Sequence, residues 1–331
     1  MEAVVPNKLR PGDRIHVIAP SRSWTSICQT PVEKESQRRA IARLESLGLR
    51  VTLGAHVWES GPFACPSVAH RLEDLHAAFA DPDIHAIITV IGGWNGNQIL
   101  HGIDFDLVAA NPKIFCGYSD ISVFQGAFLK RAKLVTYYGP HISTFGMKHG
   151  IEYTLEGFRR GLMSDAPYRI EPSSHWADDP WFLDQEARNF IENPGYVVLQ
   201  EGEAEGPTVG GNLCSFHLLQ GTPYAPDIAG RILFFEDLRN VMEFDRLLQS
   251  VLQGPGGAEV RGLVIGRSPP SSKVTRALLA HVVETKPQLR GKPVVYGVDF
   301  GHTTPHTTFP LGGTAWVRAD ADGATIEIRR H

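Results

Sequence analysis

The sequence predicts an α/β fold in which a domain built on a parallel sheet is followed by a smaller, β-rich domain. In the first half, short apolar runs alternate with amphipathic stretches, for example residues 14–20 (RIHVIAP) and 68–82 (VAHRLEDLHAAFADP). Strands separated by helices of this length are typical of βαβ units, which build parallel sheets. The second half has further apolar runs, such as 231–236 and 259–267, with few helical stretches between them.

The local pattern of each segment in the first half predicts its element. The first strand ends at Pro20, and a helix with apolar or small residues at helical spacing follows from about residue 33 until Gly48 stops it. A strand, a helix and two more strands come next, at 49–54, 68–82, 86–93 and 114–120. In parallel sheets the functional loops lie at the carboxyl ends of the strands. The segments IGG and GYSD, which close the last two strands, are expected there.

Three units are predicted along the chain. Residues 1–166 form the parallel-sheet domain. Residues 167–205 are rich in Trp, Asp and Pro, have poor periodicity and are interpreted as a long loop or linker, which in compact proteins is usually functional or disordered. Residues 206–331 form the β-rich domain, whose most helical part is 242–253.

Composition excludes several classes of protein. The chain has 331 residues, of which 42% are hydrophobic and 21% charged, as in soluble globular proteins. A net charge of −4 and the lack of a basic, aromatic-rich run argue against nucleic acid as a partner. No apolar stretch is long enough to span a membrane, and the N-terminus does not resemble a signal peptide. The four scattered cysteines fit a reducing cytoplasm and show no metal-ligand spacing; they are Cys28, Cys65, Cys116 and Cys214.

Ser119 is the first candidate for catalysis. It follows the apolar run KIFC and the residues Gly-Tyr, and it precedes a helical run (ISVFQGAFLK), so a sharp strand-to-helix turn is predicted. Such a turn presents a serine hydroxyl where backbone N–H groups and the helix dipole can stabilise an oxyanion. Ile121 replaces the final glycine of a G-x-S-x-G elbow. The alternative is that Ser119 or Asp120 only caps the following helix.

A serine nucleophile needs a base and a group that orients the base. His302 follows a strand that ends in Gly301 and is the preferred base, with His306 as the alternative. A zinc site that pairs the two histidines is disfavoured because Pro305 opposes the helix that would align them. Glu236 ends the apolar strand RILFF, where an unpaired buried charge would be costly, and is the preferred acid; Asp237 competes with it.

The segment IGGWNGN (residues 91–97) is the third feature. Two glycines at a strand end allow a close approach to a ligand, and their N–H groups could complete an oxyanion hole. The segment matches neither phosphate-binding glycine motif. A plain tight turn is the alternative.

The ordered set of motifs resembles the L,D-carboxypeptidase family of serine peptidases. The resemblance runs from Lys8 to Gly313, and the ordered combination is far more specific than any one motif. The motifs are KLRPGDRIHVIAPS, IGGWNGNQIL, GYSDIS, YYGP, GPTVGGNL, Gly221-Thr222, ILFFED and GVDFGHTTP followed by PLG.

This resemblance implies a flavodoxin-like N-terminal domain that carries Ser119 and a C-terminal domain that carries Glu236 and His302, with the site between them. It also implies an oxyanion hole formed by the N–H groups of Gly93 and Asp120. A homodimer that needs no metal or organic cofactor is expected.

Within the family, Ile91 and GGWNGNQ look more like the microcin C immunity proteins than the muropeptide-recycling carboxypeptidases. The former hydrolyse the amide between an aspartyl residue and a modified nucleotide, and the latter release a terminal D-residue from murein tetrapeptide. In the former a loop tryptophan stacks on the nucleobase, and Trp176 is the best match, with Trp181 second. Either tryptophan could instead pack on its own domain. The residues expected to bind substrate are Gly92, Trp94, Trp176, Trp181 and Asn212.

The predicted chemistry is attack of Ser119 on an amide carbonyl, with His302 as the base and Glu236 as the group that orients it. Two other classes of protein are weighed against it. One is a non-catalytic binding module on the same scaffold. The other is a dinucleotide oxidoreductase, which ranks last because no glycine fingerprint follows the first strand.

Overall fold

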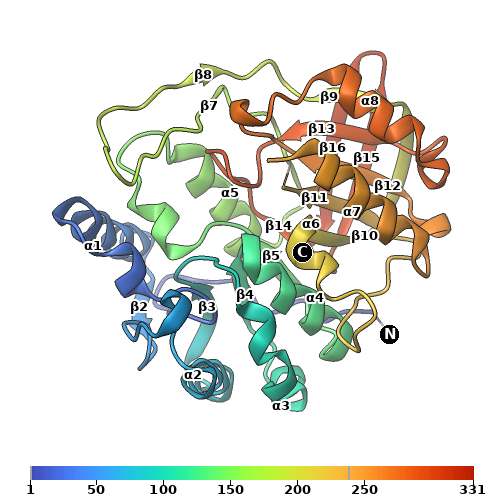
Figure 1. Ribbon diagram of the computed structural model, residues 1–331. Helices are drawn as coiled ribbons and strands as arrows, with labels where there is room; N and C mark the ends of the chain where they lie inside the picture. Colours follow the sequence, from blue (N-terminus) through green and yellow to red (C-terminus); the bar gives the residue numbers. More distant parts are fainter. Residues whose placement is uncertain (1, 238) are drawn as a thin grey trace.

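Two β-sheets organise the chain, as seen in a computed structural model that describes residues 2–237 and 239–331. Figure 1 shows them as two halves of the molecule, the first with helices α1, α2 and α3 and the second with α7 and α8. The fold is therefore mixed α/β, as the sequence predicts, with a largely parallel sheet followed by a separate sheet of eight strands.

The first sheet has six strands in the order β14-β5-β4-β3-β1-β2. Its first five strands along the chain are parallel, and their order 2-1-3-4-5 is that of flavodoxin-like proteins. The strands are β1 (Arg14–Ile18), β2 (Arg50–Leu53), β3 (Ile84–Thr89), β4 (Ile114–Gly117), β5 (Thr136–Tyr138) and β14 (Phe309–Leu311).

Helices cover both faces of this sheet. Neighbouring residues of β3 point to opposite faces, so Ile88 packs in one core cluster with Ala40 and Phe158, whereas Ile87 packs in another with Phe79 and Phe124. The helices of the chain are α1 (Pro31–Glu45), α2 (Val68–Ala80), α3 (Phe105–Ala110), α4 (Ser122–Arg131), α5 (Glu152–Leu162), α6 (Leu213–His217), α7 (Val241–Gln253) and α8 (Arg276–Glu284). Short 3-10 helices lie at Trp24–Ile27, Pro62–Ala64, Gly96–Gly102, Ser119–Ile121, Ile142–Gly146, Gly257–Glu259, Pro270–Ser272 and Pro287–Leu289.

The second sheet has eight strands in the order β6-β16-β15-β10-β11-β12-β13-β9. They are β6 (Tyr168–Arg169), β9 (Val197–Gln200), β10 (Gly202–Asn212), β11 (Ile232–Glu236), β12 (Gly262–Gly266), β13 (Val294–Val298), β15 (Thr314–Asp320) and β16 (Gly323–Arg330). Strands β10 to β13 are parallel and are joined through α6, α7 and α8. This half therefore contains more helix than the sequence predicts, since α8 was not expected.

The two halves share strands and core. Strand β14 comes from the predicted second domain but pairs with β5 of the first sheet, Phe309 opposite Tyr138. Both side chains are fully buried and pack with Phe234 and Phe300 of the second half. The interface is thus a continuous apolar core, which fixes the position of one sheet relative to the other.

The segment 167–205 is less regular than the sheets, but it is not structureless. It supplies the two edge strands β6 and β9 of the second sheet and a separate two-stranded sheet of β7 (His175–Trp176) and β8 (Ile191–Glu192). Figure 1 shows β7 and β8 along the top of the molecule. No helix among residues 2–237 and 239–331 combines the length and the apolar character that crossing a membrane requires.

Candidate active site

Ser119 lies at a sharp turn between β4 and α4. Its φ is +61°, an unusual backbone conformation for a residue other than glycine, and such strain is typical of functional sites. The helix-cap alternative is wrong, because neither α4 nor the 3-10 turn before it has a side-chain cap among the described residues. The carboxylate of Asp120 accepts hydrogen bonds from Ser21 Oγ (2.6 Å) and the Gly96 N–H (2.8 Å) instead. Asp120 thereby ties the serine turn to the end of β1 and to the glycine segment.

The structure brings Ser119, His302 and Glu236 into one hydrogen-bonded chain. His302 Nε2 lies 3.1 Å from Ser119 Oγ, and His302 Nδ1 lies 2.9 Å from Glu236 Oε2. Since an ionised carboxylate can only accept, Nδ1 donates, which leaves the lone pair of Nε2 facing the hydroxyl. This is the arrangement of a serine nucleophile, its base and the acid that orients the base.

Glu236 is 2% exposed, and both oxygens of its carboxylate have hydrogen-bond partners. Its Oε1 accepts from Tyr138 Oη (2.8 Å) and from Asn212 Nδ2 (2.9 Å). Burial by itself would raise the pKa of Glu236, but the charge of His302 and the hydrogen bonds from His302, Asn212 and Tyr138 together lower it to about 2. Glu236 is therefore a carboxylate at neutral pH, and its fixed charge faces the imidazole.

The interaction with Glu236 also raises the pKa of His302. Burial favours the neutral imidazole, but the charge of Glu236 and its hydrogen bond outweigh burial and raise the pKa above its usual value. Gly301, with a φ of +113°, lets the chain turn there, and a Cβ at this position would lie 3.0 Å from Glu236 Oε2. A glycine is therefore required directly before His302.

The two competing residues lie elsewhere. Burial lowers the pKa of His306 to about 4, and its ring packs edge-on against Tyr118 at 4.6 Å. Asp237 directs its carboxylate to Arg239, with Nε and Oδ1 2.8 Å apart. Neither residue contacts the Ser119 hydroxyl.

A cavity of about 280 Å³ opens beside Ser119 and His302. Gly92 and Gly93 line it, and a Cβ on Gly92 would come within 3.0 Å of Ser119 Cβ and 3.3 Å of the Asp120 nitrogen. The glycine turn therefore packs directly against the serine turn. Asp120 lines the cavity as well, so both residues expected to form the oxyanion hole, Gly93 and Asp120, border it beside Ser119.

The rim of the cavity carries both charge and an aromatic ring. Arg22, Asp237 and Arg239 line it, as does Trp94, whose side chain is 75% exposed. Asn212 also lines it, but its amide already contacts Glu236 and caps α6 through the Ser215 N–H. Asn212 therefore orients the acid as well as bordering the cavity.

A second cavity of about 290 Å³ adjoins the first and is mostly apolar. The two share Arg22 and Ile91, and Trp24, Trp181 and Phe182 line the second. Trp176 is not among the described residues that line either cavity; its ring lies against the guanidinium of Arg267 at 5.0 Å. Of the two loop tryptophans, Trp181 lines a cavity that shares residues with the serine cavity, whereas Trp176 lines neither of the two.

Several residues of the site were not singled out from the sequence, among them Tyr138, Arg22 and Arg239. Tyr138 falls inside the motif YYGP, so its position was visible but its contact with Glu236 was not. Arg22 and Arg239 follow strand ends, and a cationic residue just past a strand is the only signal they give. The side chains that could hold a metal ion, His56, His70 and Glu73, do not line the serine cavity.

Known proteins share this architecture over the full chain. The family model of the LD-carboxypeptidase N-terminal domain matches residues 15–139, and that of the C-terminal domain matches residues 205–317. "Putative carboxypeptidase YocD" of Bacillus subtilis is 44% identical over 327 residues, which are 98% of this chain and 99% of that protein. The chain belongs to the LD-carboxypeptidase family. It is therefore a serine peptidase.

Solved structures of LD-carboxypeptidase relatives agree with this assignment. An MccF-like protein from Bacillus anthracis superposes with a TM-score of 0.96 at 42% identity, covering 99% of this chain and 100% of the other. The microcin C7 self-immunity protein MccF, in complex with aspartyl sulfamoyl adenosine, superposes with a TM-score of 0.85 at 26% identity, covering 99% of each chain. The family's activity is thus that of a serine carboxypeptidase or an MccF-like hydrolase.

Proposed function

We propose that Ser119, His302 and Glu236 hydrolyse the amide bond between an acidic aminoacyl group and a modified nucleotide, as a detoxifying reaction. The observation that carries the catalytic part is the unbroken chain of hydrogen bonds from Glu236 through His302 to Ser119. Glu236 is ionised at neutral pH, as the group that orients the base must be.

The reaction runs in two steps on these residues. His302 takes the proton of Ser119 as Oγ attacks the carbonyl carbon, and the N–H groups of Gly93 and Asp120 hold the resulting oxyanion. His302 then gives the proton to the leaving nitrogen, so the C–N bond breaks and an ester on Ser119 remains. Water, activated by His302, cleaves that ester and restores the serine.

The two adjoining cavities support an aminoacyl-nucleotide as the substrate. The cavity at Ser119 fits an acidic acyl group, because Arg22 lies on its rim, beside an Arg239 that is paired with Asp237. The neighbouring apolar cavity fits a flat base, since Trp181 offers a stacking surface there. Arg22 borders both cavities. Among the described residues its guanidinium donates to the Ser26 carbonyl alone, at 3.3 Å, so it can reach an anionic linkage between the two cavities.

The second candidate is removal of the terminal D-alanine from murein tetrapeptide. The carboxypeptidase name of the 44% identical relative favours it. A free terminal carboxylate would also find Arg22 or Arg239 on the rim. The apolar cavity beside Trp181 has no evident occupant in that reaction, which is why we rank it second.

A substrate panel tests the proposal. Purified protein is incubated with aspartyl- and glutamyl-sulfamoyl adenosine, processed microcin C and murein tetrapeptide, and products are read by mass spectrometry, with Ser119→Ala as the control. We expect release of the acidic amino acid from the nucleotide substrates by the native protein alone. Release of D-alanine with intact nucleotides would establish the second candidate, and hydrolysis that persists in Ser119→Ala would refute the catalytic assignment.

A further inference from the structure

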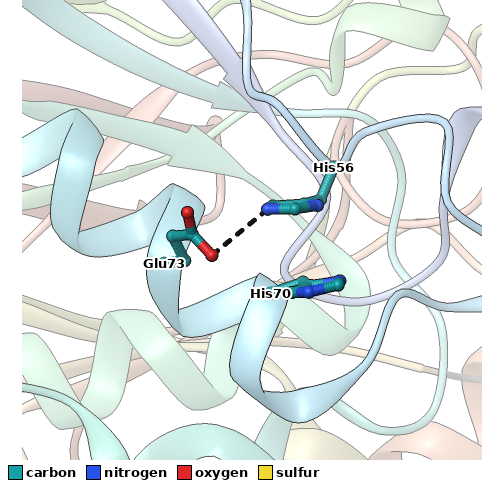
Figure 2. A group of neighbouring side chains, drawn as sticks. All are labelled: His56, His70 and Glu73. Atoms are coloured by element: carbon teal, nitrogen blue, oxygen red, sulfur yellow. Dashed lines mark ion pairs between the residues drawn. The ribbon is translucent and has the colours of Figure 1, made fainter.

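Helix α2 carries charged side chains in two different settings. His70 and Glu73 gather with His56 of the loop after β2, as Figure 2 shows, and do not line the serine cavity. Arg71, which follows His70 in the sequence, is only 2% exposed and belongs to the buried side of the helix. A buried guanidinium must find hydrogen-bond acceptors, because an unsatisfied buried charge is costly. The proposed reaction assigns Arg71 no role.

The acceptors of Arg71 are mainly backbone carbonyls of two turns. Its Nη1 donates to the Asn95 carbonyl at 3.0 Å and to the Pro20 carbonyl at 3.3 Å. Its Nη2 donates to Gln98 Oε1 at 2.9 Å. Asn95 belongs to the glycine segment (residues 91–97), and Pro20 lies in the turn after β1. Arg71 therefore joins α2 to both of these turns.

The carboxylate of Asp120 holds the same two turns. Its Oδ2 accepts from the Gly96 N–H at 2.8 Å and from Ser21 Oγ at 2.6 Å. The Asn95 carbonyl and the Gly96 N–H belong to one peptide group, so Arg71 binds the oxygen of that peptide and Asp120 binds its nitrogen. Hydrogen bonds to charged groups are stronger than those between neutral groups. Burial raises the pKa of Asp120, and the charge of Arg71 is among the effects that oppose this rise.

Ser21 connects this arrangement to the expected oxyanion hole. A Cβ on Gly93 would lie 2.3 Å from Ser21 Oγ, so Gly93 packs directly on the hydroxyl that donates to Asp120. The other expected donor is the N–H of Asp120 itself. Both donors therefore belong to segments that Arg71 and the Asp120 carboxylate fasten together. An oxyanion hole stabilises charge only when its donors lie about 2.7–3.1 Å from the oxyanion, so a small displacement of either segment should lower the rate.

We propose that Arg71 is a positioning residue of the oxyanion hole, which acts by fixing the glycine segment against the serine turn. This inference rests on the proposed function, in which the N–H groups of Gly93 and Asp120 hold the oxyanion. Arg71 is not among the described residues that line the serine cavity, so its effect passes through the two turns. The oxyanion forms only as Ser119 attacks. Arg71 should therefore affect the transition state far more than the binding of intact substrate.

The kinetics of two Arg71 variants test the inference, on aspartyl sulfamoyl adenosine or murein tetrapeptide, whichever the native protein cleaves. Arg71→Met keeps an apolar stem but removes the charge and every donor. Loss of one oxyanion donor costs about 10²–10³ in kcat, so displacement of one should cost about 10- to 100-fold. Arg71→Lys is the milder variant. It keeps the charge but loses the planar fork that reaches several acceptors, and kcat should fall about 3- to 10-fold.

Binding of uncleaved substrate separates positioning from general damage to the site. In a Ser119→Ala background the substrate stays intact, and calorimetry measures its Kd with and without Arg71→Met. We expect the two Kd values to agree within about twofold, because no oxyanion forms in this background. A loss of affinity as large as the fall in kcat would mean that Arg71 only supports the shape of the cavity, and would overturn the inference.

The matched control is Arg43→Met. Arg43 is a half-buried arginine of α1 whose guanidinium also donates to backbone carbonyls, those of Phe145 and Met147. Its loss should leave kcat near the native value, because neither carbonyl belongs to the glycine segment or the serine turn. Circular dichroism and Tm check that each variant folds.

Two results would overturn the inference alone. One is a native kcat in either Arg71 variant, and the other is an equal loss of kcat in Arg43→Met. A native protein that cleaves neither substrate would instead refute the proposed function, and this inference with it.

Discussion

The triad and the substrate-binding rim sit around one cavity but are built in opposite ways. Glu236 is buried, and Tyr138, Asn212 and His302 use both of its oxygens. Trp94, on the rim, is mostly exposed and makes no hydrogen bond with its ring among the described residues. The core therefore holds the triad in place, and we expect the exposed side chains of the rim to select the substrate. Changes in the core should reduce the rate, and changes on the rim should alter binding.

Substitution of the nucleophile should have the largest effect. Ser119→Ala removes the only atom that forms the acyl intermediate, and loss of such a nucleophile costs about 10⁶-fold in kcat in the best-studied serine peptidase. We expect kcat to fall at least about 10⁴-fold on the substrate identified by the panel. KM should change little, because the rim is untouched. Activity within tenfold of native would place the chemistry elsewhere.

Glu236→Gln should have the second-largest effect on kcat. The amide matches the carboxylate in shape but can donate to His302 Nδ1, which stabilises the wrong tautomer, and the equivalent change in a serine peptidase lowers kcat by about 10⁴. The expected loss is therefore about 10³- to 10⁴-fold in kcat. The matched control is Asp237→Asn, since Asp237 pairs with Arg239 and not with the imidazole. If the control were as damaging as Glu236→Gln, the acid would be misassigned.

The pH dependence reports on the same ion pair. His302 acts as a base only when neutral, and the charge of Glu236 raises its pKa above the usual 6.5. The rate should therefore fall tenfold per unit as pH drops below that raised pKa. In Glu236→Gln the raising charge is gone and burial dominates, so the acid limb should move to lower pH. A limb that stays in place would mean that Glu236 does not set the pKa of His302.

The sequence predicted the buried triad better than the exposed rim of the cavity. Ser119, Glu236 and His302 each end or follow an apolar strand, which marks them as candidates, and the ordered family motifs were enough to propose them as one set. The parallel direction of the strands in the first sheet was also predictable, because strands and helices alternate along that half of the chain. By contrast, β14 pairs with β5 across the two halves, and nothing in the segment FPL indicates its partner.

The rim of the cavity was less accessible to prediction. The choice between Trp176 and Trp181 depends on how an irregular segment folds back, and their spacing in sequence carries no information about that. His56 and His70 are similarly unrelated by helical periodicity, and only the loop after β2 brings their rings together. Contacts made by irregular segments depend on tertiary packing, which local pattern does not encode.

Substitution of the two loop tryptophans should have the smallest effect. It tests most directly whether the rim affects substrate binding and not the rate. Trp181 lines the apolar cavity that adjoins the serine, whereas Trp176 packs on Arg267. Stacking of a base on an aromatic ring contributes about 1–3 kcal/mol, so Trp181→Ala should raise KM for aspartyl sulfamoyl adenosine about tenfold with kcat nearly unchanged. Trp176→Ala is the matched control and should leave KM within twofold. The reverse result would make Trp176 the stacking residue, whereas a fall in kcat for Trp181→Ala would show that the rim also positions the scissile bond.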